Sequence, residues 1–296
     1  MSAAARPNDV DRLLRATAGP YEPVGARSLA RTGHPAVWEV VADDGRQLFA
    51  KRYKDLLFHQ RETAGYWRLA PAIGSGRAPV LTAEDARSLL LVATALPGTP
   101  VTGATLTAAE AQEVYRQAGH LAAVIHAQPT TGAPVGEHRS WAAERERTLA
   151  RARDARPTEE DIEVLADATH TKPPRTGLVY CHGDFGPRNW IVRRDNDGRL
   201  VIGVIDFERS QVEEPVRRDL MRIAIQLAPH RGDLGAAFAS GYGREFTPQV
   251  QEACRAWAAI DCPAALRWAL AHHQDEEVLG YARTVLDLLR HPNLFA

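Results

Sequence analysis

A hairpin flanked by acidic and amide side chains constrains the fold more than any other feature of the sequence. Asp184 stands five residues before Asn189, an apolar run follows, and a second apolar run ends at Asp206. Between the two runs, the turn sequence Asp-Asn-Asp-Gly at 195–198 predicts a β-hairpin. One rigid element could therefore present two carboxylates and an amide.

Phosphoryl transfer from a nucleotide needs groups of this kind. A carboxylate must hold and deprotonate the substrate hydroxyl, and oxygen ligands must hold magnesium against the phosphates. The residues alone leave other interpretations open, since Asp and Asn also favour turns and caps. His182 with two aspartates could also form the metal site of a hydrolase. Such a site normally contains further closely spaced histidines, and His272 and His273 would diverge by ~100° on a helix.

Composition excludes few classes of protein. The chain of 296 residues is long enough for one large domain or for two lobes around a cleft. Hydrophobic residues make up 45% and charged residues 25%, which is typical of an ordinary folded core. The net charge of -1, without a basic block, argues against nucleic acid as a partner.

The cysteines and the N-terminus predict a cytoplasmic protein. Cys181, Cys254 and Cys262 have no metal-type spacing and are expected to be reduced, buried thiols. Residues 1–7 lack the apolar core of a signal peptide, and no stretch reaches the ~18 apolar residues of a membrane span. We therefore expect no membrane partner, and either a monomer or a dimer.

Periodicity predicts an α+β chain in which a small antiparallel sheet precedes a mostly helical region. The pattern break at Leu96-Pro97-Gly98 places the boundary between an N-terminal lobe, 1–96, and a C-terminal lobe, 97–296. In the first lobe we expect helices at 8–16 and 57–70 and strands at 36–41, 47–53, 79–81 and 88–95. In the second we expect hairpin strands at 190–192 and 200–205 and helices at 107–127, 141–155, 159–168, 216–227, 234–242, 248–260, 263–272 and 275–289.

The motifs His182-Gly-Asp184-x4-Asn189 and Val204-Ile-Asp206-Phe-Glu208 resemble the catalytic loop and metal-binding segment of the aminoglycoside phosphotransferase family. The resemblance covers most of the chain. It implies the two-lobed protein-kinase-like fold, with a small antiparallel β N-lobe and a larger, mostly helical C-lobe. It also implies that Asp184 is the catalytic base, that Asn189 and Asp206 bind Mg²⁺, and that ATP or GTP is the phosphate donor.

The same resemblance implies a lysine–glutamate pair in the N-terminal lobe. Lys51 lies in a strand-like run, where the family places a lysine that contacts the α- and β-phosphates. Glu62, eleven residues later on the next helix, would hold that lysine in place. Without the resemblance, Lys51 could be a solvated strand end and Glu62 an exposed helix position.

Two further segments are expected to contact the nucleotide. Main-chain groups near Thr94 and Leu96 would meet the purine, as in the hinge between lobes. Ser28 and Gly33 are candidates in the loop over the phosphates, although this loop lacks the G-x-G-x-x-G spacing of protein kinases. An A-P-E activation segment is also missing, which argues against a regulated protein kinase.

Other residues have supporting roles in this interpretation. His126, His182 and Asp219 are expected to brace the catalytic loop, with Asp219 accepting hydrogen bonds from its backbone. Arg188 is a candidate for offsetting charge on the transferred phosphate; the alternative is a surface ion pair.

The C-terminal helices are expected to form the acceptor pocket. Acidic and aromatic side chains there would suit a polar or cationic, sugar-like ligand, and the candidates are Glu208, Trp257, Asp261, Trp268, His272 and Asp275. The alternative for Asp275 and the two glutamates after it is a solvated helix start.

The predicted function is that of a small-molecule O-phosphotransferase that moves the nucleotide γ-phosphate to a substrate hydroxyl. An antibiotic is the first candidate for the acceptor, because an Arg-rich, Lys-poor chain suggests a GC-rich bacterium in which a resistance enzyme is plausible. The alternatives are a metabolite kinase for a substrate such as choline or homoserine, and a non-catalytic, pseudokinase-like binding protein.

Overall fold

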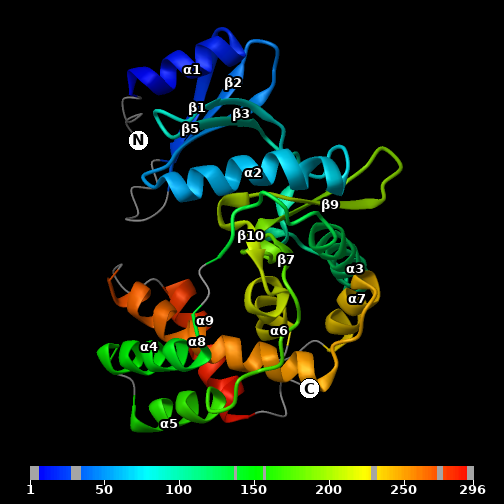
Figure 1. Cartoon of the computed structure of the whole chain (residues 1–296). Coiled ribbons are helices and arrows are strands. Elements are labelled where there is room, and N and C mark those ends of the chain that lie inside the picture. Colours follow the sequence, from blue (N-terminus) through cyan, green and yellow to red (C-terminus); the bar gives the residue numbers. More distant parts are fainter. Residues whose placement is uncertain are drawn as a thin grey trace. The chain divides into compact units, whose positions relative to one another are not determined.

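A computed structural model of the chain describes residues 7–27, 35–136, 139–155, 158–227, 232–271 and 276–291 (Figure 1). The described residues form an N-terminal antiparallel sheet followed by a largely helical part. The α+β class predicted from the sequence is therefore confirmed.

Contacts between Cα atoms divide the chain into two compact units. Unit 1 comprises Met1–Thr105, Gly132–Pro134 and Pro187–Gln211, and unit 2 comprises Leu106–Thr131, Val135–Gly186 and Val212–Ala296. The hairpin thus belongs with the N-terminal sheet although it lies far along the chain. The division into lobes at residue 96 stays a prediction.

A five-stranded antiparallel sheet in the order β1-β2-β3-β5-β4 forms the base of unit 1. Its strands are β1 (Tyr21–Arg27), β2 (Ala36–Ala42), β3 (Gln47–Arg52), β4 (Leu81–Asp85) and β5 (Leu90–Thr94). Strand β1 was not predicted from the sequence, because Pro23 and Gly25 interrupt its pattern. The register with β2 shifts between these two residues, as at a β-bulge in an edge strand.

Two helices pack on this sheet. Val10 and Leu14 of α1 (Asn8–Ala18) join a core with side chains of β2, β3 and β5, among them Ala50. Because side chains alternate along a strand, Lys51 lies on the opposite face from Ala50. There its amino group reaches α2 (Leu56–Ile73), which begins at a cap where the Asp55 carboxylate accepts the Leu57 amide.

Helix α2 makes a very close contact with the short helical turn η3 (Phe207–Arg209). A Cβ atom added to Gly65 would lie 2.3 Å from the Cβ of Phe207. The Tyr66 ring meets the Phe207 ring edge to face, with 5.4 Å between centroids. Glycine at this position therefore allows α2 to pack directly on the segment that follows Asp206.

The predicted hairpin forms part of a second sheet in unit 1, with strand order β6-β8-β9. These strands are β6 (Thr99–Pro100), β8 (Trp190–Arg194) and β9 (Leu200–Val204), and Trp190 pairs with Val204. The helical turn η1 (Val101–Gly103) follows β6, and the helical turn η2 (Pro187–Asn189) leads directly into β8. The hairpin is confirmed, and Asn189 stands at its entry.

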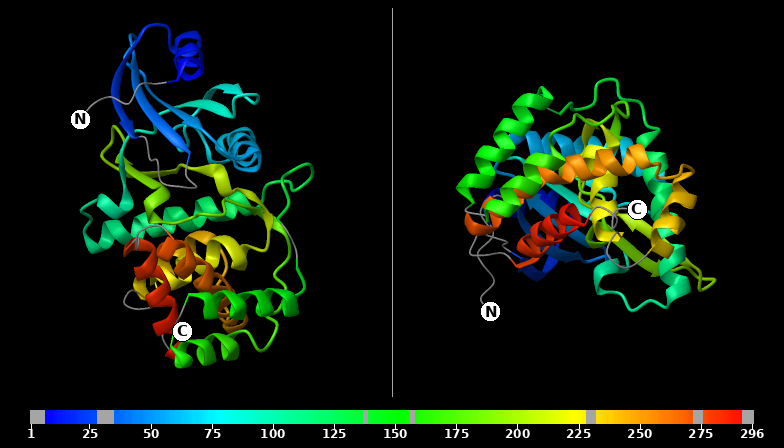
Figure 2. Two further views of the ribbon diagram at one scale, coloured as in Figure 1. Left: turned by 90° about the vertical axis from the view of Figure 1, so that its left-hand side faces the viewer. Right: turned by 90° about the horizontal axis from the view of Figure 1, so that it is seen from below.

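Unit 2 is mainly helical. Its helical elements are α3 (Ala108–His126), α4 (Trp141–Asp154), α5 (Glu159–Ala168), the π-helical turn η4 (Val216–Leu220), α6 (Met221–Leu227), α7 (Gly232–Tyr242), α8 (Pro248–Ala271) and α9 (Glu276–Arg290). Strand β7 (Val179–Cys181) pairs with β10 (Gln211–Glu213). Figure 2 shows α8, in orange, with the green helices α4 and α5 and the red helix α9 beside it. Within the described residues, no helix combines the length and apolarity needed to cross a membrane.

The prediction of two helices separated at Pro263 is wrong. Helix α8 continues through Pro263, and both Cys262 and Pro263 are buried within it. A proline removes one backbone donor, but packing of α8 against α4, α6 and α9 compensates for this loss. Strands β7 and β10 were missed because three residues are too short to show a period.

Helices α3 and α7 meet at backbone distance (Figure 1). A Cβ atom on Gly119 would lie 2.0 Å from the carbonyl oxygen of Phe238. One on Gly241 would lie 1.8 Å from the carbonyl oxygen of Arg116. Since real Cβ atoms never come this close, the two glycines are required for the helix pair.

Candidate functional site

Lys51, Glu62 and Asp206 form a partly buried charge cluster in unit 1. The Lys51 amino group donates to Glu62 Oε1 at 2.8 Å and to Asp206 Oδ1 at 2.8 Å. Burial alone would lower the pKa of Lys51, but the charges of Asp206 and Glu62 outweigh it and raise the pKa well above its usual value. The lysine is therefore permanently charged and fixed in direction.

Glu62 is fully buried and has a second partner. The hydroxyl group of Tyr53 donates to Glu62 Oε2, so both carboxylate oxygens are engaged. Burial raises the pKa of Glu62, and Lys51 offsets this only in part. Tyr53 was not predicted as a site residue, because an aromatic residue at the end of a strand is usually a core residue.

Glu208 joins this cluster. Single carboxylate oxygens of Glu62, Asp206 and Glu208 all lie within 4.8 Å of one another. Burial first, and then the negative charge of Asp206, raise the pKa of Glu208 to about 7. The three carboxyl groups supply oxygen donors of the kind that Mg²⁺ prefers.

The backbone of Asp206 is unusual. Its φ of 71° and ψ of 67° place it in the left-handed region, which residues other than glycine rarely adopt. Asn189 is buried directly before strand β8, and its carbonyl oxygen accepts the amide of Ile205, the residue before Asp206, at 3.0 Å. The two candidate metal ligands therefore stand at the same end of the hairpin.

The candidate hinge is fixed within unit 1. The Thr94 amide donates to the Val80 carbonyl at 2.9 Å, and the Ala95 amide donates to the Gln47 carbonyl at 2.8 Å. The Leu96 side chain lies against Gly203, where an added Cβ would be 2.6 Å from Leu96 Cδ2. The other two nucleotide candidates, Ser28 and Gly33, lie outside the described residues.

In unit 2, Asp219 holds the loop that carries Asp184. Its carboxylate accepts the His182 amide at 2.8 Å and the Gly183 amide at 2.7 Å, and lies 3.0 Å from His126 Nε2. Burial alone would raise the pKa of Asp219, but the bond and charge of His126 outweigh burial and the pKa lies below its ordinary value. A buried anion thus binds two backbone amides of the loop.

Asp184 itself is buried, with 6% of its surface exposed. Its amide donates to Nδ1 of His182 at 3.3 Å. Arg222 Nη1 lies 3.5 Å from Asp184 Oδ1, a contact that was not predicted from the sequence. The only signal in the sequence is a basic residue one helical turn after Asp219.

The remaining candidates lie in different settings. Trp257 is buried, with the Trp141 ring at 5.2 Å and the Arg217 guanidinium carbon 4.6 Å from its ring centroid. Asp261 accepts the Tyr281 hydroxyl at 3.1 Å. Trp268 is half-buried and Arg188 is exposed, whereas His272 and Asp275 lie outside the described residues.

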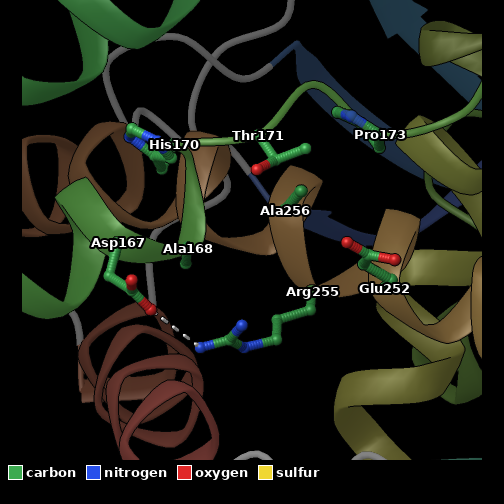
Figure 3. Close-up of a pocket in the computed structure, with 8 residues that line it drawn as sticks. All are labelled: Asp167, Ala168, His170, Thr171, Pro173, Glu252, Arg255 and Ala256. Carbon is green, nitrogen blue, oxygen red and sulfur yellow. Dashed lines mark ion pairs between the residues drawn. The ribbon is translucent and has the colours of Figure 1, made fainter.

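A cavity of about 210 Å³ lies elsewhere in unit 2 (Figure 3). Arg255 and Asp167 line it and form an ion pair in which Nη2 of Arg255 lies 3.7 Å from Oδ2 of Asp167; neither is a predicted site residue. The other lining residues are Ala168, His170, Thr171, Pro173, Glu252 and Ala256.

Residues 26–261, which are most of the chain, match the family described as the phosphotransferase enzyme family (APH). The chain belongs to this family. It is therefore a small-molecule phosphotransferase, a kinase that acts on hydroxyl groups, and the resemblance noted in the motifs is confirmed.

Solved structures with the same fold include enzymes for different acceptors. The phosphotransferase is similar to macrolide 2'-phosphotransferase MphH from Brachybacterium faecium, with 23% identity, a TM-score of 0.61, and coverage of 94% of this chain and 98% of that one. The GDP and kanamycin complex of APH(2")-IIia has 13% identity, a TM-score of 0.68, and coverage of 96% and 99%. A choline/ethanolamine kinase family protein from Mesorhizobium loti has 16% identity and a TM-score of 0.62, and the match covers 96% of this chain and 92% of that one. At these identities the similarity shows the fold alone, and no curated protein sequence matches the chain.

Proposed function

We propose that the phosphotransferase moves the γ-phosphate of ATP or GTP to a hydroxyl group of a small molecule, with Mg²⁺ as cofactor. The observation that carries this proposal is the placement of Lys51 between Glu62 and Asp206, with both contacts at 2.8 Å. A permanently charged, rigidly held lysine beside carboxylate oxygens suits a metal–triphosphate complex.

In this proposal residues 1–96 form the nucleotide-binding lobe. Lys51 contacts the α- and β-phosphates, and Glu62 keeps it oriented. Main chain near Thr94 and Leu96 meets the purine, with Leu96 the better candidate because the Thr94 and Ala95 amides are engaged in the sheet. Ser28 and Gly33 belong to the loop over the phosphates.

Asp206 and Asn189 are the proposed ligands of Mg²⁺, and Glu208 is a third. When held by these residues, the ion would offset the negative charge of the phosphates. Arg188 adds a cation near the transferred phosphate. These roles require oxygen donors on a rigid support, which the hairpin of unit 1 supplies.

Asp184 is the proposed base, and 97–296 is the lobe that receives the acceptor. The acceptor oxygen bonds to the γ-phosphorus while its proton passes to the Asp184 carboxylate. The bond from phosphorus to the bridging oxygen breaks, and its electron pair leaves with the nucleoside diphosphate. Asp184 precedes Asn189 by five residues, which limits the separation of their Cα atoms to ~18 Å.

An antibiotic is the first acceptor to test, which would make this a cytoplasmic resistance enzyme. Proteins of the same fold bear the names of macrolide, aminoglycoside and choline/ethanolamine kinases, so a metabolite is the second candidate. The proposed pocket residues are Trp257, Trp268, His272 and Asp275 of unit 2, whereas Glu208 is assigned to the metal site and Asp261 to the pair with Arg222. The protein would act as a monomer or a dimer.

The test is an assay of ATP and of GTP, each with Mg²⁺, against kanamycin, a macrolide, choline and homoserine. The expected result is one acceptor class that gains the mass of one phosphate, and no gain with Asp184→Ala. Nucleotide binding without transfer to any hydroxylated compound would instead favour a pseudokinase-like binding protein.

Asp206→Ala should weaken binding of the magnesium–nucleotide complex by about 10-fold or more, because a ligand of the ion and a partner of Lys51 are both lost. Calorimetry with and without Mg²⁺ measures this effect. Asp197→Ala is the control, since Asp197 is an exposed acid in the turn of the same hairpin. Equal affinities for the two variants would remove Asp206 from the metal site.

A further inference from the structure

Arg222, on α6, bridges two carboxylates in unit 2. Its Nη1 atom lies 3.5 Å from Asp184 Oδ1, and its Nη2 atom lies 3.7 Å from Asp261 Oδ2. The two arms of one planar guanidinium group therefore connect Asp184 with helix α8. The Arg222 side chain is 21% exposed, so solvent screens these contacts only in part.

A third helix fixes this bridge. The Tyr281 hydroxyl, on α9, donates to Asp261 Oδ2 at 3.1 Å. The Arg222 guanidinium carbon also lies 6.0 Å from the centroid of the Tyr281 ring. Arg222 is thus held between residues of α8 and α9, and its fork cannot rotate without losing both partners.

The charge on Arg222 is permanent. Burial alone would lower the pKa of its guanidinium, but Asp261 and then Asp184 outweigh burial and raise the pKa above its usual value. Arg222 also follows Asp219 by one helical turn, and Asp219 binds the amides of His182 and Gly183. The helical segment that contains Asp219 and Arg222 therefore contacts the Asp184 loop twice. Asp219 binds backbone amides of the loop, and Arg222 lies beside the Asp184 carboxylate.

We propose that Arg222 is a positioning residue for Asp184, and that Asp261 and Tyr281 hold Arg222 in place. The role rests on the proposed function of Asp184 as base. The guanidinium fixes the direction of the Asp184 carboxylate before the acceptor hydroxyl arrives. Asp261 then acts through Arg222, instead of binding the acceptor directly.

Three variants test this role: Arg222→Met, Arg222→Lys and Asp261→Asn. Arg222→Met should lower kcat by about 10- to 100-fold, while the acceptor KM and the nucleotide Kd change by less than about threefold. Arg222→Lys should restore part of kcat, because it keeps the charge and loses the fork. Asp261→Asn should lower kcat by a smaller factor and leave the acceptor KM unchanged.

Arg255→Met is the matched control. Arg255 also pairs with an aspartate of unit 2 at 3.7 Å, and its side chain is 25% exposed. It lines the cavity shown in Figure 3, and it is not a predicted site residue. Its removal should change Tm to a similar degree as Arg222→Met and leave kcat near that of the unchanged enzyme. If none of the tested acceptors is phosphorylated, the kcat of each variant relative to the unchanged enzyme is measured for the hydrolysis of ATP and of GTP by water.

A kcat for Arg222→Met within about twofold of the control overturns the proposal. A raised acceptor KM with unchanged kcat in Asp261→Asn also overturns it, because Asp261 would then be an acceptor ligand. If Arg222→Met does not fold, Arg222→Lys serves as the test. In that variant an unchanged kcat together with an unchanged Tm would contradict the positioning role. Asp184→Ala is measured in parallel: if it stays active, the proposed base is wrong, and if it is inactive, only the Arg222 role is at issue.

Discussion

Asp184→Ala is expected to lower kcat by about 10²–10⁴-fold, the usual contribution of a positioned general base. The proposed nucleotide contacts at Lys51 and Asp206 belong to unit 1 and are not altered. The Kd for ATP and GTP with Mg²⁺ should therefore stay unchanged. Single-turnover phosphate transfer measures the first effect, and calorimetry measures the second.

Two further variants make this result specific. Asp184→Asn keeps the shape of the side chain and removes the proton acceptor, so it should be nearly as inactive as Asp184→Ala. Asp154→Ala removes an acid of α4 whose side chain is 67% exposed, and it should keep full kcat. Near-normal turnover in Asp184→Asn would show that another group is the base.

Asp219→Ala is expected to reduce the free energy of unfolding by about 3–5 kcal/mol, as when one partner of a buried charged network is removed. The amides of His182 and Gly183 and the His126 ring would all lose an acceptor in a buried site. Each unsatisfied buried group costs about 1–3 kcal/mol. Denaturant unfolding measures the loss, and kcat should fall because the Asp184 loop is released.

The pH dependence of unfolding offers a second measurement on Asp219. Its pKa in the folded chain lies below the ordinary value of 3.8, so the carboxylate stabilises the fold at neutral pH. This contribution is lost as the pH falls through the ordinary value and then the folded one. The Asp219→Ala protein should therefore show less change in stability across that acidic range. A loss below about 1 kcal/mol at neutral pH would contradict the bracing role.

The sequence predicted those parts of the fold that depend on local chemistry. The hairpin was clear because Asp-Asn-Asp-Gly at 195–198 separates two apolar runs, and α3 was clear because Thr107 and Glu110 form a capping box. Pattern could not reveal β1, whose bulge at Pro23 and Gly25 breaks the alternation. The pattern also suggested that Pro263 ends a helix. Helix α8 continues through Pro263 because it packs on residues that are distant in sequence.

Side chains of the candidate site were predictable where a motif carried them. Lys51, Glu62 and Asp206 are far apart in sequence, yet the structure joins them at 2.8 Å. Tyr53 and Arg222 belong to no motif, because their roles arise only when α2 meets β3 or when α6 meets α8. Glu208 was assigned to the acceptor pocket, whereas the structure groups it with Glu62 and Asp206.

The glycine contact between α3 and α7 limits how the enzyme can be made more heat-resistant. Exchanging a helical glycine for alanine usually stabilises a protein by about 0.5–1 kcal/mol, since alanine restricts the unfolded chain. At Gly119 and Gly241 the added methyl group would collide with a carbonyl oxygen of the facing helix, so the sign reverses. Gly280 of α9 meets nothing within 4 Å, and the same exchange is open there. Among these helical glycines, Gly280 can therefore be replaced by alanine, whereas Gly119 and Gly241 are required by the contact between α3 and α7.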